Sequence, residues 1–547
     1  MRPIDGRCAM EIFAYEPLGF EGFLVKIEVD IRRGIPAVDI VGLAAASVRE
    51  SRERVRAAVR NAGFAFPQDR VLINLSPADL PKEGSLYDLP IAAVVLGAAG
   101  LVPDCGRAVL ALGELTLDGS VRPVRGTLPA LLRASRCGIS DFIVPSANWA
   151  EASKLRCGRL YPISHICELQ SLLIAIREGA EPQAVRHDDA ELGKSREGEA
   201  GSALVDRLSA SAYSSEDAGD LFPGTGLDFS DYVGNEKVIR ALLVAAAGRH
   251  NVLLFGPPGS GKTMAALRFP SLLPPLEDGP ALEVAALWSL RGKRFMPAEG
   301  GSYPPVRAPH HSASLEGLIG GGRPLRPGEI SLAHKGVLFL DETPEFGRDV
   351  LQSLREPLER GTIAIVRAGR VLQYPADFQL LLAANSCPCG NLGNPAKTCL
   401  CSPVEIQRYW RKLGGPLLDR IDMRIPVAAP GIGSMAGAQT ADQGRMKLRV
   451  KQAVRRQMER SREWGGVFNS RLSPDLVRRF CSPEGKAFEL LREKADELGF
   501  SMRACHSVMK IARTIADLEA SDEIEAPMVE EACSYREFGE GECYWPF

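Results

Sequence analysis

One stretch constrains this chain more than any other: residues 251–263, which read Asn-Val-Leu-Leu-Phe-Gly-Pro-Pro-Gly-Ser-Gly-Lys-Thr. The apolar run at 252–255 is typical of a buried parallel strand. The residues after it match Gly-x-x-x-x-Gly-Lys-Thr, the pattern of a phosphate-binding loop. The next residues predict a helix whose positive N-terminal end faces the bound phosphates. The stretch therefore predicts an α/β nucleotide-binding domain rather than a glycine-rich turn.

Each residue type in this loop has a predicted role. The glycines let backbone N–H groups turn inward and cradle phosphate oxygens. Lys262 places a cation at the β and γ phosphates, and the Thr263 hydroxyl is a ligand for Mg²⁺. The predicted nucleotide-binding residues of the loop are Gly256, Pro257, Pro258, Gly259, Ser260, Gly261, Lys262 and Thr263.

Two further apolar runs end in polar side chains. Residues 336–340 are followed by Asp341 and Glu342, and a run from residue 378 ends in Asn385. We expect Asp341 to hold Mg²⁺ with the nucleotide and Glu342 to orient and deprotonate the attacking water. Asn385 is predicted to align that water against the γ-phosphate. The plainer alternatives are a carboxylate pair that caps a strand and an asparagine in a turn.

The whole-chain totals limit the protein's class and location. A chain of 547 residues predicts about three domains. Its net charge of −2 means that any nucleic-acid surface must be a local patch. Thirteen cysteines without a signal peptide indicate reduced thiols in the cytoplasm. The longest apolar stretch, residues 91–102, is too short and too rich in Ala and Gly to span a bilayer, so we expect no membrane partner.

Composition divides the chain into four segments. Residues 1–178 predict an α/β domain, with strands at 23–31 and 38–41 joined by a turn, and an amphipathic helix at 47–62. Val48, Val55 and Val59 mark the apolar face of that helix, and we interpret its many arginines as a solvated face. The polar, Gly/Ser-rich segment 179–228 predicts a flexible linker. The remaining segments are an ATPase domain at 229–430 and a helical domain at 431–547.

A long insert lies between the two nucleotide motifs, at about residues 276–334. It carries His310 and His311 and a glycine-rich run with scattered arginines. Such loops either contact nucleic-acid phosphates or only pack the insert, and the sequence leaves both readings open. The basic helix predicted at 444–464 has the same two readings, DNA contact or a solvated face. Its basic residues are Lys447, Lys451, Arg455, Arg456, Arg460 and Arg462.

Four cysteines lie within fifteen positions after the Asn385 run, at Cys387, Cys389, Cys399 and Cys401. Four thiols so close together can form a tetrahedral zinc site. The Cys-x-Cys spacing is tighter than the usual zinc-ligand spacing, so free thiols in a loop remain the alternative.

Two arginines are candidates for charge stabilisation during hydrolysis. In a ring ATPase, Arg420 can reach the γ-phosphate of the neighbouring subunit, and Arg503 can lean over the nucleotide as a second sensor. The plain alternative for Arg420 is a surface salt bridge to Asp419 or Asp422.

Together these motifs closely resemble the ComM/YifB family of Mg-chelatase-like AAA+ ATPases. The resemblance rests on residues 50–58, 81–85, 309–311, 328–334, 336–342, 387–390, 415–422 and 511–518. It implies a Lon-protease-like N-terminal α/β domain, an AAA+ domain with a doubly wound parallel sheet, and a helical C-terminal domain. It also implies ATP and Mg²⁺ as cofactors, a homohexamer, and single-stranded or branched DNA as the partner of a translocase or branch-migration helicase.

The Lon-like resemblance does not extend to peptidase residues. The position of the family's serine falls on Leu86, and the segment of its lysine, residues 126–132, contains no lysine. Without a basic amine nothing activates a hydroxyl, so we expect no peptidase activity. The competing functions are a metal-chelatase motor subunit and an ATP-dependent protein remodelling factor. The Lon-like domain favours the DNA motor, because chelatase motor subunits lack it.

Overall fold

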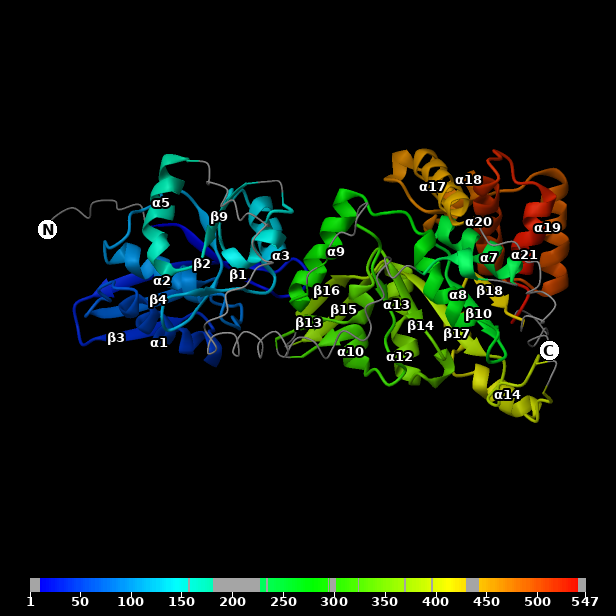
Figure 1. The fold of residues 1–547 in the computed structure, drawn as a ribbon, viewed down its shortest axis with the longest axis horizontal. Coiled ribbons are helices and arrows are strands. Elements are labelled where there is room, and N and C mark those ends of the chain that lie inside the picture. Colours follow the sequence, from blue (N-terminus) through cyan, green and yellow to red (C-terminus); the bar gives the residue numbers. More distant parts are fainter. Residues whose placement is uncertain are drawn as a thin grey trace.

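The computed structural model describes residues 10–539, apart from residues 156–157, 181–226, 233–234, 294, 296–301, 323, 368–369, 395–396 and 429–441. Figure 1 shows an N-terminal lobe in blue and cyan beside a larger lobe in green, yellow and red. The predicted linker, residues 179–228, lies almost entirely outside the described residues. Within the described part of the chain, no helix combines the length and apolar character needed to cross a membrane.

A five-stranded sheet forms the centre of the larger lobe. In spatial order its strands are β11 (Val306–Arg307), β14 (Val337–Leu340), β17 (Gln379–Asn385), β10 (Val252–Gly256) and β18 (Met423–Pro426). All neighbouring strands are parallel, so the carboxyl ends of β10, β14 and β17 meet at one edge. Alternate residues of these strands enter two different apolar clusters, one on each face of the sheet. The α/β fold class predicted from the sequence is confirmed.

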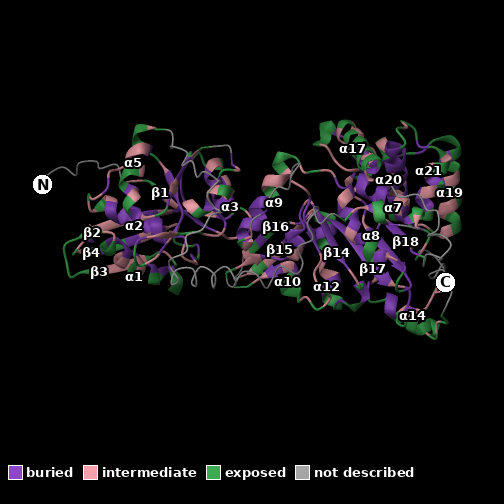
Figure 2. Cartoon of the chain, viewed as in Figure 1, coloured by how far each residue is buried: buried purple, intermediate pink, exposed green. Residues whose placement is uncertain are grey.

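Helices cover this sheet, and a hairpin extends from it. Figure 2 shows that buried residues concentrate along the strands and on α7. The hairpin is formed by β15 (Thr362–Arg367) and β16 (Arg370–Pro375). The helices of this part are α7 (Glu236–Gly248), α8 (Lys262–Arg268), α9 (Asp278–Arg291), α10 (Leu315–Ile319), α11 (Glu329–Leu332), α12 (Arg348–Ser353), α13 (Arg355–Arg360), α14 (Pro403–Trp410) and α15 (Gly415–Leu418).

The N-terminal lobe is built on a seven-stranded sheet. Its spatial order is β3 (Ala37–Val41), β4 (Arg70–Ser76), β2 (Phe23–Arg32), β1 (Ile12–Glu16), β5 (Val109–Ala111), β8 (Asp141–Pro145) and β9 (Arg159–Ile163). The two strands predicted on either side of a turn, β2 and β3, are present but do not pair with each other, because β4 lies between them, antiparallel to β2 and parallel to β3. The helices of the lobe are α1 (Ala46–Asn61), α2 (Asp88–Ala98), α3 (Thr127–Arg136), α4 (Trp149–Ala152) and α5 (Leu169–Glu178).

The arginine face of α1 is only partly solvated. Val48, Val55 and Val59 are buried, as the sequence predicts. Arg54, however, donates two hydrogen bonds of 2.8 and 3.0 Å to the buried carboxylate of Asp88 at the start of α2. Arg54 therefore joins two helices of the lobe and does not belong to a free basic surface.

The C-terminal region is helical, as predicted. Its helices are α17 (Gln443–Arg460), α18 (Pro474–Phe480), α19 (Gly485–Leu498), α20 (Met502–Leu518) and α21 (Ala526–Ser534). The basic helix α17 buries Met446, Val450 and Ala453 at helical spacing. Its Arg460 forms an ion pair with the buried Asp517, so that cation stabilises the helical core. Lys447 and Lys451 remain exposed.

The two lobes dock directly on each other. Helix α3 packs on α9, and the amide of Gly126 donates a 3.0 Å hydrogen bond to the carbonyl of Ser289. The β15–β16 hairpin also contacts the N-terminal lobe, because the amide of Phe20 donates to the carbonyl of Gln373 at 3.2 Å. One apolar cluster contains buried residues of both lobes.

Candidate active site

The phosphate-binding loop joins the end of β10 to the start of α8. Gly259 and Gly261 have φ angles of 76° and 91°, in the left-handed region that favours glycine. The Lys262 ammonium donates hydrogen bonds of 2.9 Å to the carbonyls of Gly256 and Pro257. Burial lowers the pKa of Lys262 to about 8, and the nearby negative charge of Asp341 offsets this effect only in part. The loop otherwise offers the ammonium carbonyl dipoles. A phosphate group would supply the missing negative charge.

Thr263 and Asp341, the two predicted Mg²⁺ ligands, come together from different elements. The Thr263 hydroxyl donates a 2.8 Å hydrogen bond to Oδ2 of Asp341, and Oδ1 accepts a 2.8 Å bond from the amide of Glu342. A hydroxyl and a carboxylate at the mouth of a phosphate loop are the oxygen ligands that Mg²⁺ binds beside nucleotide phosphates. The residues present therefore fit the ion.

The predicted base, Glu342, is the second residue after β14 and has a left-handed conformation with φ 48°. Its carboxylate Oε2 lies 3.7 Å from Nδ1 of His311, which belongs to the insert. The ring of His310 stacks on that of His311 with centroids 4.0 Å apart. The structure thus brings the histidine pair to the predicted catalytic carboxylate. Sequence reasoning missed this contact, because nothing in the spacing between the insert and β14 indicates it.

Asn385 lies at the active-site edge of the sheet. The register between β17 and β10 pairs Asn385 with Gly256, the first residue of the phosphate loop. Next to it, the buried Thr343 hydroxyl lies 3.0 Å from the carbonyl oxygens of Leu340 and Ala383. This hydroxyl links the ends of β14 and β17, so the neighbouring strands hold Asn385 and the carboxylates in fixed relative positions.

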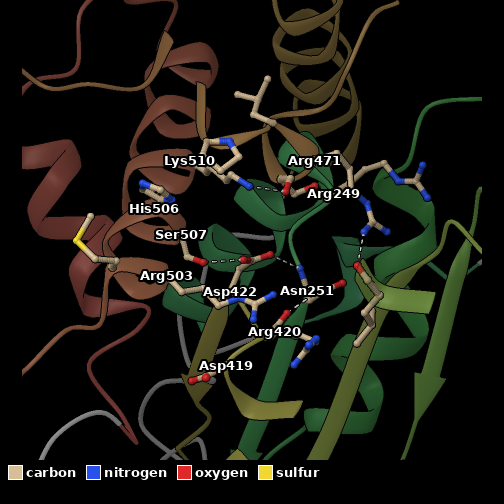
Figure 3. A pocket seen from close by; sticks show the side chains of 15 residues that line it. Arg249, Asn251, Asp419, Arg420, Asp422, Arg471, Arg503, His506, Ser507 and Lys510 are labelled. Carbon is tan, nitrogen blue, oxygen red and sulfur yellow. Dashed lines mark hydrogen bonds between the residues drawn. The ribbon is translucent and has the colours of Figure 1, made fainter. Parts of the chain in front are cut away.

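Arg420 and Arg503 lie at the opposite end of the strands. Asn251 precedes β10, and its side-chain amide donates a 3.0 Å hydrogen bond to the carbonyl of Arg420. The phosphate loop follows the other end of β10, and a five-residue strand spans roughly 15 Å. Figure 3 shows Arg420 and Arg503 lining one pocket near Asn251. The expectation that Arg503 leans over the nucleotide of its own chain is therefore corrected, since the fold places it beyond the far strand ends.

The partner of both arginines is Glu359, in α13. Arg420 and Arg503 both bond Oε1 of this carboxylate, Arg503 at 3.1 Å. Burial raises the pKa of Glu359, but the hydrogen bonds and charges of Arg503 and Arg420 outweigh that effect and hold it below its usual value. The predicted alternative pairing of Arg420 with Asp419 or Asp422 is thus replaced by a pairing with Glu359.

The pocket around Arg420 and Arg503 holds more cations than carboxylates. It has a volume of about 440 Å³ and is also lined by Arg249, Arg471 and Lys510, with Asp419 and Asp422 as its acidic residues. Lys510, on α20, points into it in Figure 3. Such a set of cations suits an anion as multiply charged as a nucleotide phosphate.

The four cysteines form a compact cluster directly after β17. The described part of the chain contains one such group, and its Sγ atoms all lie within 4.8 Å of one another. Cys387 is buried and Cys389 is exposed. Four converging thiols fit a tetrahedral metal ion.

Comparisons with known proteins agree with this arrangement. Three family models match: "Subunit ChlI of Mg-chelatase" over residues 27–148, "Magnesium chelatase, subunit ChlI" over 228–434, and "Magnesium chelatase, subunit ChlI C-terminal" over 441–536. The chain is 38% identical to the competence protein ComM of Haemophilus influenzae, over 96% of this chain and 97% of that protein.

Two further relatives are similar over nearly their full lengths. The protein YifB of Salmonella typhimurium is 39% identical, over 95% of both chains. An uncharacterized protein of Mycobacterium tuberculosis, Rv2897c, is 40% identical over 96% of this chain and 98% of its own.

Proposed function

This chain belongs to the ComM/YifB family of magnesium-chelatase-like AAA+ ATPases, and from that membership we propose that it is a ring motor on DNA. Six copies would hydrolyse ATP to move along single-stranded or branched DNA, as a translocase or branch-migration helicase. A reducing cytoplasm is the proposed place of action, and one Zn²⁺ in the cysteine cluster is proposed as a structural ion.

The chemistry of one turnover follows from the residues at the active-site edge. Lys262 and the amides of the phosphate loop hold the β and γ phosphates of ATP. Thr263 and Asp341 would hold Mg²⁺, which would supply positive charge beside the phosphate oxygens. Asn385 aligns a water, and Glu342 takes its proton while the water oxygen attacks the γ-phosphorus. The bond from that phosphorus to the β-γ bridging oxygen breaks, and ADP leaves.

One observation carries the ring arrangement. The loop, the carboxylates and Asn385 lie at one end of the strands, whereas Arg420 and Arg503 lie at the other. In a ring, the second end of one subunit meets the nucleotide of the next. The cationic pocket would then receive the γ-phosphate of a neighbour. A monomer makes no evident use of this pocket.

Local charge supports DNA as the partner, together with the family resemblance. Lys447 and Lys451 are exposed on α17, and His310 is exposed beside the active site. A net charge of only −2 does not oppose phosphate binding through such local patches.

ATP turnover measured with different partners tests the proposal. We expect single-stranded DNA and four-way junctions to raise the ATPase rate, and salt to reduce that stimulation. Unfolded protein, or a chelatase partner with a porphyrin, should leave the rate unchanged. The Glu342→Gln protein controls for contaminating ATPases. Stimulation by unfolded protein or by the chelatase partner, with none by DNA, would replace the DNA motor by the corresponding alternative.

A further inference from the structure

We propose that the cysteine cluster binds one zinc ion and that this ion supports the phosphate-binding loop, so that zinc loading sets the affinity for ATP. The inference deepens the proposed function, since it rests on ATP binding at that loop. It does not depend on DNA.

The sulfur positions suit a metal better than disulfides. The Sγ atom of Cys387 lies 3.4 Å from that of Cys389 and 3.6 Å from that of Cys399, and Cys389 and Cys399 are 3.7 Å apart. A tetrahedron with Zn–S bonds of 2.3 Å has sulfurs about 3.8 Å apart. A disulfide requires about 2.05 Å. The fourth thiol, Cys401, lies within the same group.

Backbone amides also turn toward these sulfurs. The N–H of Leu392 donates to Sγ of Cys387 at 3.4 Å, and the N–H groups of Asn391 and Leu400 are directed at Cys389. Amide donors stabilise thiolates, which are the form that binds metal. Backbone donors thus converge on these sulfurs from the loop around them.

The cluster rests directly on the phosphate loop. Cys387 follows Asn385 by two residues, and the amide of Gly390 donates to the carbonyl of Cys387 at 3.0 Å, which closes a tight turn. A Cβ added at Gly390 would lie 2.7 Å from Cγ of Pro258 in the phosphate loop. The turn that carries two of the ligands therefore packs against the outside of that loop.

A second contact ties the same turn to β10. The indole N–H of Trp410, in α14, donates to the carbonyl of Ser386 at 3.1 Å. The Trp410 ring meets Phe255 edge-on, with centroids 6.0 Å apart. Phe255 is the residue before Gly256. Trp410 thus links the start of this turn to the carboxyl ends of β17 and β10.

Zinc should act by keeping this turn rigid. With the ion bound, four sulfurs converge on one point and the turn holds Pro258 in place. Without it, nothing ties the four sulfurs to one point, so the turn is freer to move and the phosphate loop must be ordered at the expense of ATP binding. We expect the dissociation constant for ATP to rise about tenfold, which is about 1.4 kcal/mol.

The first experiment measures metal and nucleotide on the full-length protein. Elemental analysis after purification without added metal should find about one zinc per chain. Co²⁺ exchanged into the site should give the absorption bands of a tetrahedral tetrathiolate. Cys389→Ser should lose zinc and bind a fluorescent ATP analogue about tenfold more weakly. Cys137→Ser is the control, because Cys137 is an exposed cysteine at the end of α3.

The second experiment leaves all four ligands intact. Gly390→Ala pushes a methyl group into Pro258, so it should retain zinc and still bind ATP more weakly. Gly63→Ala is the matched control, because Gly63 also has a positive φ, of 85°, but has no atom within 4 Å of an added Cβ. Absence of zinc, even after zinc is added under reducing conditions, overturns the site. Unchanged ATP affinity in both Cys389→Ser and Gly390→Ala overturns the coupling. If DNA does not stimulate the wild-type ATPase but zinc and ATP affinity behave as expected here, only the proposed function is overturned.

Discussion

At the scale of single residues, we assign nucleotide binding and hydrolysis to different side chains of the candidate active site. Lys262, Thr263 and Asp341 are the proposed contacts of the phosphates and the ion, whereas Glu342 projects from a left-handed backbone with 58% of its side chain exposed. An exposed carboxylate is available to a water molecule. Its removal should therefore affect proton transfer more than affinity.

We expect Glu342→Gln to bind ATP normally and to hydrolyse it about 10²- to 10⁴-fold more slowly, because an amide cannot accept the proton of the water. Single-turnover hydrolysis and equilibrium nucleotide binding measure the two effects separately. Lys262→Ala is the contrasting variant and should lose tight ATP binding. Wild-type turnover by Glu342→Gln would remove this residue from the role of base.

His311 should act as a positioning residue for Glu342. We expect His311→Gln to lower kcat by roughly tenfold with little change in KM, a smaller effect than loss of the base itself. His310→Gln is the matched control, since the Nδ1 of His310 faces the hydroxyl of Ser312 at 2.8 Å. A pH–rate profile adds a second readout, because its shape should change only when His311 is replaced. Equal kinetics of the two variants would contradict the assignment.

Sequence reasoning reached the residues whose chemistry is local to a motif. The loop, the carboxylate pair and Asn385 each follow a strand, so their common edge follows from the parallel sheet. His311 and Glu359 were not predicted as partners of Glu342 and the two arginines, because only the tertiary fold brings them together. The basic helix α17 was predicted, but the ion pair of Arg460 with the buried Asp517 was not, because Asp517 lies far away in the sequence.

At the scale of secondary-structure elements, Asp377 joins the ATPase sheet to the helical region. It precedes β17, and its carboxylate forms ion pairs with Lys335 at 3.1 Å, Arg471 at 2.9 Å and Arg249 at 3.8 Å. Burial raises the pKa of Asp377, but the charges of Arg249, Arg471 and Lys335 outweigh it and hold that pKa far below its usual value. Arg471 lies after α17, so its ion pair with Asp377 links the helical region to this cluster.

Asp377→Asn should lower the free energy of unfolding by about 3 kcal/mol at neutral pH, because three cations lose their shared carboxylate. A depressed pKa contributes stability above the unfolded value near 4, and that contribution is lost as pH falls through the folded pKa. The difference from wild type in urea unfolding should therefore shrink toward acid pH. Glu356→Gln, which removes an exposed pair with Arg360, should cost less than about 1 kcal/mol. A pH-independent difference would contradict the ionic account.

Strand order was the part of the fold least accessible from sequence. The β2–β3 turn was located correctly, yet β4 enters between the two strands. Turn residues indicate where the chain reverses, but pairing depends on which distant strand buries the exposed edges. The Lon-like character of this lobe stays a prediction of the resemblance.

At the scale of the whole molecule, Arg420 and the phosphate loop lie at opposite ends of the ATPase sheet, so variants at the two ends can test the proposed ring. Arg420→Ala should keep ATP affinity within a few-fold and lose about 10³-fold or more in hydrolysis, as arginine fingers do in related phosphate-loop enzymes. Mixing Arg420→Ala with Lys262→Ala should restore some activity, because some interfaces then join an intact Arg420 to an intact Lys262.

Light scattering with ATP present should show the oligomer in which this rescue occurs. Hydrolysis at the wild-type rate by Arg420→Ala, or a monomeric active species, would exclude the ring. If Arg420 only stabilised α13 through Glu359, its loss would lower stability slightly and leave turnover intact.

The docking of the two lobes predicts how the protein behaves after proteolytic cleavage between them. Helix α3 rests on α9, and the β15–β16 hairpin meets the N-terminal lobe, so the covalent connection through residues 179–228 is not what keeps the halves together. If a protease site is placed in that segment, the severed halves should elute as one particle and keep their ATPase activity. Size-exclusion chromatography before and after cleavage measures this directly. The length and continuity of this connecting segment would then be free to vary, because the contacts between the two lobes keep them together.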